Sequence, residues 1–135
     1  LLLPDKFMRL KYQSDAANQG YAIMMKHNGF ILADVVGLGK TIIASIIAKK
    51  FVYENGYHSK ILVVYPPALE GNWKRTIKDF HIWNNVYFVS TGKTTIAFWS
   101  LLPAKSFSDF LENPSINIFC VLPTCSFILS NECAR

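Results

Sequence analysis

A short run of glycine, lysine and hydroxyl side chains has the composition of a phosphate-binding loop: Gly37-Leu38-Gly39-Lys40-Thr41. The glycines leave the backbone without Cβ atoms, so successive N–H groups can point at phosphate oxygens. Lys40 would bring a positive charge to the β- and γ-phosphates, and the hydroxyl of Thr41 is a natural ligand for Mg²⁺. These residue types predict a site for ATP with Mg²⁺.

The flanking segments have the patterns of the strand and the helix that such a loop needs. The apolar run Phe30-Ile31-Leu32-Ala33 is typical of a buried parallel strand. From Thr41 to about Glu54 apolar residues recur at helical spacing, and Asn55-Gly56 ends this expected helix. The amino end of the helix would add its positive dipole end to the phosphate site.

Two features limit how far the loop can be read as a general phosphate-binding pattern. Asp34 stands where that pattern has its first glycine. A second Gly-Lys-Thr, Gly92-Lys93-Thr94, follows an expected strand too closely to wrap a phosphate. We interpret the second copy as a surface turn and the first as the nucleotide site, with a plain glycine turn as its alternative.

Strands and helices alternate over the first two-thirds of the chain. The patterns predict helices over 11–27 and 70–80, and strands over 61–65 and 86–90. Short connections between strand, helix and strand indicate an α/β fold, in which helices cover a parallel sheet. Beyond Ser90 a helix over 95–102 and a strand over 116–122 are expected.

Charge and composition favour some classes of protein over others. The net charge is +5, and residues 1–95 hold its whole excess of Lys and Arg. This suits a polyanion such as nucleic acid, although a mildly basic domain is the alternative. No apolar run is long enough for a membrane span, and no secretory signal is visible, so we expect a cytoplasmic protein. Three cysteines near the end favour neither a disulfide framework nor a zinc site.

The run Ile31-Leu32-Ala33-Asp34, continuing into the phosphate loop, resembles motif I of the Swi/Snf-type ATPases of helicase superfamily 2. That family has an Asp where the general pattern has its first glycine, so Asp34 agrees with it. Val35-Val36, in place of the commoner Glu-Met, is similar to the bacterial branch. Leu10-Lys11-Tyr12-Gln13 resembles the family's Tyr-Gln element, and the segment 61–80 is similar to its motif Ia.

The resemblance implies a RecA-like P-loop fold, with three layers around a parallel sheet, truncated here. It also implies an adenine contact from Gln13, whose amide can bond the adenine edge twice. The implied nucleotide-binding residues are Gln13, Asp34, Gly37, Leu38, Gly39, Lys40 and Thr41. Motif Ia lies along DNA in this family, which makes the implied DNA-contacting residues Pro67, Ala68, Lys74 and Arg75. For the last two, a solvated helix face is the alternative.

Two parts of an intact motor of this family are missing from the sequence. The Asp-Glu pair that holds Mg²⁺ and activates water is absent, and the strand expected over 116–122 runs into Pro123 instead. The second RecA-like lobe, with its arginine finger, is also absent. We therefore expect residues 1–113 to be part of an ATP-binding lobe and 114–135 a non-matching tail, with an altered reading frame favoured over a genuine short nucleotide-binding protein.

The expected function follows from what is present and what is missing. The chain would be the ATP-binding portion of a DNA translocase, binding ATP with Mg²⁺ and hydrolysing it little or not at all. One alternative is a small-molecule P-loop kinase, but such an enzyme needs Arg residues in a lid, and residues 91–134 contain none. The other alternative is a nucleotide-binding interaction module without catalysis.

Overall fold

A computed structural model of the chain describes residues 3–5, 7–8, 10–33, 39–90, 116–121 and 125–129, the last two ranges by their backbone. The elements are α1 (Lys11–His27), β1 (Gly29–Leu32), α2 (Lys40–Glu54), β2 (Lys60–Tyr65), α3 (Glu70–Asp79), β3 (Val86–Ser90), β4 (Ile116–Val121) and β5 (Cys125–Leu129), with single 3-10 turns at Pro67–Leu69 and Trp83–Asn85. The helices and strands expected up to Ser90 are confirmed within one or two residues, as is the strand expected over 116–122. The helix expected over 95–102 and the turn at Gly92-Lys93-Thr94 lie outside the described residues.

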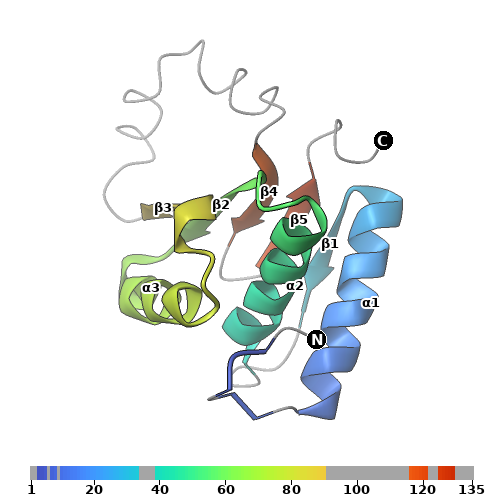
Figure 1. Cartoon of the computed structure of the whole chain (residues 1–135), viewed down its shortest axis with the longest axis horizontal. Helices are drawn as coiled ribbons and strands as arrows, with labels where there is room; N and C mark the ends of the chain where they lie inside the picture. The colour runs from blue at the N-terminus through green and yellow to red at the C-terminus, as the bar shows by residue number, and fades with distance from the viewer. Residues whose placement is uncertain are drawn as a thin grey trace.

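The strands form one sheet in the order β1-β5-β4-β2-β3 (Figure 1). β2 pairs in parallel with both β3 and β4. β5 pairs antiparallel with β4 on one side and with β1 on the other. β1 therefore runs in the same direction as β2, β3 and β4, and the carboxyl ends of these four strands meet at one edge of the sheet.

β5 is a strand that the sequence patterns did not predict, and it makes the sheet mixed rather than wholly parallel. Its direction follows from the length of its connection to β4, which is residues 122–124. So short a connection permits a hairpin, whereas a parallel neighbour needs a crossover of a dozen residues or more. The expectation of a parallel sheet is thus confirmed for four of the five described strands.

The three described helices lie side by side on one face of the sheet (Figure 1). α2 is central: residues 43–48 are all buried, because α1 packs on one side, α3 on the other and the sheet beneath. β2 contributes Ile61, Val63 and Tyr65 to the same core, which are alternate residues on one face of the strand. Trp73 of α3 is 1% exposed and belongs to this core as well.

The described residues thus form two of the three layers expected, one of helices and one of strands. The third layer remains a prediction, and so does the division of the chain at residue 113. In the described ranges, no helix is both long and apolar enough to cross a membrane.

Candidate nucleotide-binding site

Two helices begin at the sheet edge where β1 ends. α1 and α2 run parallel to each other, and the carboxyl end of β1 points to the same edge as their amino ends (Figure 1). A helix leaves its first four backbone N–H groups without acceptors in the helix and carries a partial positive charge at that end. This edge of the sheet is therefore suited to binding an anion. Residues 34–38, which join β1 to α2, lie outside the described residues.

Gly39 precedes the first residue of α2 and has a left-handed backbone conformation, with φ of +80°. Its carbonyl oxygen accepts the first hydrogen bonds of the helix, from the N–H groups of Ile42 at 2.9 Å and Ile43 at 3.0 Å. A residue with a Cβ adopts this conformation at a cost of roughly 1–2 kcal/mol. The glycine at this position is thus needed to turn the chain into α2.

Gln13, in the first turn of α1, places its side-chain amide directly against Gly39. A Cβ on Gly39 would lie 2.5 Å from Gln13 Nε2, closer than real Cβ contacts allow. The Gln13 side chain is 4% exposed, and its Nε2 donates a hydrogen bond to the Tyr12 hydroxyl at 3.3 Å. The structure therefore brings together two of the residues expected at the site, which are far apart in the sequence.

Lys40 and Thr41 form the start of α2, next to Gly39. Both are partly exposed, so each keeps access to solvent at the amino end of the helix. The backbone carbonyl of Thr41 accepts a hydrogen bond of 2.7 Å from the buried Ser45 hydroxyl. Of the expected nucleotide-binding residues, Gln13, Gly39, Lys40 and Thr41 thus gather at one place, while Asp34, Gly37 and Leu38 lie outside the described residues.

The residues expected to contact DNA follow β2. Pro67 and Ala68 are exposed in the 3-10 turn beyond the carboxyl end of the strand, and Arg75 is exposed on α3. Lys74 differs from Arg75, because its Nζ lies 2.6 Å from a carboxylate oxygen of Glu70. This hydrogen bond raises the pKa of Lys74 above its ordinary value. Glu70 therefore already neutralises part of the charge of Lys74 within α3.

Sequence reasoning missed two contributors to this region. Tyr12 was named as part of the Tyr-Gln element, with no contact assigned to it, yet its hydroxyl accepts a hydrogen bond from the Gln13 amide. Glu70 was not considered, although its spacing of four residues from Lys74 is the spacing of ion pairs on a helix. The second signal was available in the sequence, whereas the first depends on side-chain directions that spacing does not give.

Comparison with known proteins identifies the family of this chain. The SNF2-related domain matches residues 12–120, from the start of α1 into β4. The chain belongs to this family. Over 80 residues it is 38% identical to a Bacillus subtilis (strain 168) protein named "Uncharacterized ATP-dependent helicase YqhH", a match that covers 58% of this chain and 14% of that protein. No solved structure matches the chain.

The family match confirms the resemblance inferred from the motifs. An SNF2-related domain implies a RecA-like fold and ATP binding, in agreement with the parallel strands and with Gly39 and Lys40 at the start of α2. The chain thus spans about one-seventh of the length of the Bacillus relative.

Proposed function

We propose that this chain is the ATP-binding portion of an SNF2-type motor whose intact form couples ATP hydrolysis to movement along DNA. The observation that carries the proposal is the contact between Gln13 and Gly39. An amide that could hydrogen-bond a base lies there beside the amino end of α2, which could bind phosphate. One nucleotide could then meet both groups.

The adenine and the phosphates would contact different residues of the site. The Gln13 amide can accept a hydrogen bond from adenine N6–H and donate one to N7, a pair that guanine does not offer. Lys40 would neutralise charge on the β- and γ-phosphates, and the N–H groups of the first turn of α2 would bond their oxygens. The positive φ of Gly39 supports this role, since it turns the chain so that α2 can present those groups.

Mg²⁺ would be bound by Thr41 together with phosphate oxygens. The described residues contain no group of three His, Cys, Asp or Glu side chains that could hold a metal ion. Mg²⁺ prefers oxygen ligands and commonly keeps several waters, with substrate phosphates completing its coordination. The hydroxyl of Thr41, a partly exposed residue in the first turn of α2, is consistent with this preference.

DNA would bind along the loop and helix that follow β2. Pro67 and Ala68 lie at the carboxyl end of a parallel strand, the edge at which open α/β sheets bind ligands. Arg75 would contact phosphate as a charged and exposed side chain. Because the sequence has no Asp-Glu pair, we propose that the chain binds ATP without appreciable turnover.

Titration of the full chain with a fluorescent ATP analogue tests this function. Lys40→Ala should weaken binding by about tenfold or more, the effect of losing roughly 1.4 kcal/mol of a charge-assisted phosphate contact. Lys26→Ala, which removes an exposed lysine from the last turn of α1, is the matched control and should bind as the wild type does. Equal affinity of the two variants would contradict the proposed site.

Competition between ATP and GTP tests the part assigned to Gln13. The wild type should prefer ATP, and Gln13→Ala should lose most of that preference, by about tenfold if two hydrogen bonds of roughly 0.7 kcal/mol each disappear. Preference for ATP that survives in Gln13→Ala would remove the adenine contact from the proposal and leave the phosphate site in place.

A further inference from the structure

We propose that the hydrogen bond between Tyr21 and Glu54 holds α1 on α2 in the position that places Gln13 against Gly39. Tyr21 and Glu54 are then positioning residues for recognition of the adenine base, although both lie far from the nucleotide. The inference rests on the proposed function, because it assigns a task to α1 beyond its share of the core.

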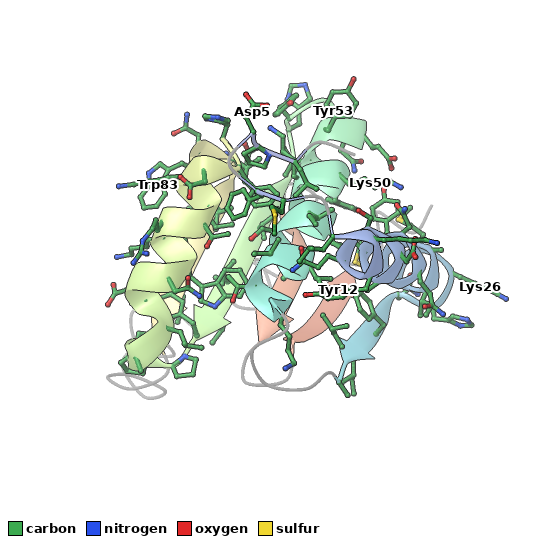
Figure 2. All side chains as sticks on the ribbon, turned by 90° about the horizontal axis from the view of Figure 1, so that it is seen from below. Asp5, Tyr12, Lys26, Lys50, Tyr53 and Trp83 are labelled. Atoms are coloured by element: carbon green, nitrogen blue, oxygen red, sulfur yellow. The ribbon has the colours of Figure 1, made fainter. Side chains whose placement is uncertain are left out.

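The pair links the middle of one helix to the end of the other. Tyr21 lies in α1 and donates its hydroxyl hydrogen to a carboxylate oxygen of Glu54, the last residue of α2. Lys50 adds a second contact, with its Nζ 4.5 Å from the centroid of the Tyr21 ring. Figure 2 shows the side chains of Lys50 and Tyr12 in the region where α1 and α2 lie side by side.

The pKa of Tyr21 agrees with this geometry. Burial, followed by the hydrogen bond and the negative charge of Glu54, raises that pKa well above its ordinary value. The hydroxyl therefore keeps its proton at any physiological pH and remains a donor to Glu54.

Gly20, next to Tyr21, allows α1 to pack closely against β1 and α2. A Cβ on Gly20 would lie 2.6 Å from Phe30 Cζ of β1 and 3.3 Å from Ile47 Cδ1 of α2. The absence of a side chain at Gly20 thus lets α1 pack against strand and helix together. Position and orientation of α1 are set here, at Gly20 and Tyr21.

The helix itself transmits this position to Gln13. Gln13 and Gly20 are seven residues apart, which is roughly 10 Å along the axis and nearly two full turns, so they share one face. Both are buried, as are Ala17 and Met24 on the same face. The amino end of α1 has no side-chain cap and no acidic residue in its first turn. The first turn therefore depends on packing further along α1 for its position.

The test measures the ratio of the affinities of the full chain for ATP and GTP in Tyr21→Phe. Loss of the hydroxyl should reduce this ratio by about fivefold, at the lower end of usual coupling factors. Affinity for inorganic tripolyphosphate, which needs Lys40 but not Gln13, should remain unchanged. Tyr53→Phe removes a hydroxyl from an exposed tyrosine of α2 and should leave both quantities as in the wild type.

Three further variants decide between positioning and a general loss of structure. Glu54→Gln retains an acceptor for the Tyr21 hydroxyl and should retain the preference for ATP, whereas Glu54→Leu should lose it. In the Gln13→Ala background Tyr21→Phe should have no additional effect on the ratio. An unchanged ratio in Tyr21→Phe, or a parallel loss of tripolyphosphate binding, would overturn the inference.

The outcomes also separate this inference from the proposed function. If Lys40→Ala and Gln13→Ala behave as proposed but Tyr21→Phe and Glu54→Leu keep the wild-type ratio, the nucleotide site stands and the positioning role is wrong. If Lys40→Ala binds ATP normally, the proposed function itself fails. Should Tyr21→Phe unfold, Gly20→Ala takes its place, and the ratio of the affinities for ATP and GTP should fall in this variant too. Gly71→Ala is its control, because a Cβ at position 71 would have nothing within 4 Å.

Discussion

The amide of Gln13 and the backbone of Gly39 are in direct contact, so that position 39 has no room for a Cβ. Gly39 also has a φ of +80°, which disfavours any other residue even with space available. Two separate costs therefore fall on Gly39→Ala: backbone strain and a collision with Gln13.

We expect Gly39→Ala to lower the free energy of unfolding by about 1–2 kcal/mol for the strain alone, with a further loss from the collision. Gln13→Ala should relieve the collision but not the strain, so the effect of Gly39→Ala should be smaller in that background. Urea unfolding of the single and double variants measures the difference. Gly56→Ala is the control for strain, because φ there is +64° and the nearest atom to a Cβ is at an ordinary 3.5 Å. Equal effects of Gly39→Ala in both backgrounds would show that the two residues do not touch.

The ion pair of Lys74 leads to a prediction about DNA binding. Arg75→Ala should reduce the slope of log affinity against log salt by about one, the effect of losing one phosphate contact. Lys74→Ala should reduce it less, because Glu70 already pairs with Lys74 at 2.6 Å. Glu70→Gln should strengthen binding by freeing that charge. Fluorescence anisotropy with a labelled duplex at several salt concentrations gives the slopes, and a larger change in Lys74→Ala than in Arg75→Ala would contradict this view.

The raised pKa of Tyr21 predicts how stability changes in alkali. In the unfolded chain tyrosine loses its proton near its ordinary pKa of about 10, while burial and Glu54 keep Tyr21 protonated in the folded protein. The unfolded state therefore binds fewer protons above that pH, and the free energy of unfolding falls as pH rises. Urea unfolding at pH 8 and pH values above 10 should show a steeper loss for the wild type than for Tyr21→Phe. Tyr21→Phe should still lose some stability in alkali, because burial also raises the pKa of Tyr65.

Asn85 fastens the start of β3 to the loop before β2. Its Nδ2 donates hydrogen bonds to the carbonyl oxygens of Tyr57 and Ser59, each at 2.9 Å, and its side chain is buried. Asn85→Ala should leave two carbonyl groups without this donor and lower the free energy of unfolding by about 1–3 kcal/mol. Asn84→Ala, at the exposed neighbouring position, should change it little. Thermal or urea unfolding of the two variants makes the comparison.

The sequence predicted those parts of the fold that depend on local pattern. α2 was predicted because its apolar residues recur at helical spacing between Gly39 and Asn55, and β2 because five apolar residues precede two prolines. β5 was missed because Cys125-Ser126-Phe127-Ile128-Leu129 does not alternate apolar with polar residues, although Pro123-Thr124 and Ser130-Asn131 flank it as turn signals. Its neighbours, β1 and β4, are set by pairing between distant segments, which local pattern does not contain.

The candidate site was predictable in its residue types but not in its contacts. The glycine-lysine segment and the Tyr-Gln element identify Gln13, Gly39 and Lys40, whereas their closeness results from the packing of α1 beside α2. The pairing of Lys74 with Glu70 could have been foreseen from helical spacing. The hydrogen bond between Tyr21 and Glu54 could not, since it joins the middle of one helix to the end of another.

The place of β5 between β1 and β4 has a consequence for the order in which the protein folds. β1 leaves the ribosome before the other described strands, yet its partner in the sheet is β5, the last of the described elements to be made. Until then β1 lacks its pairing partner among the described strands, while α1 already packs against it. Contacts between such distant segments are slow to form. We therefore expect the helices and β2 with β3 to gather early in synthesis, and the nucleotide site to reach its final shape late.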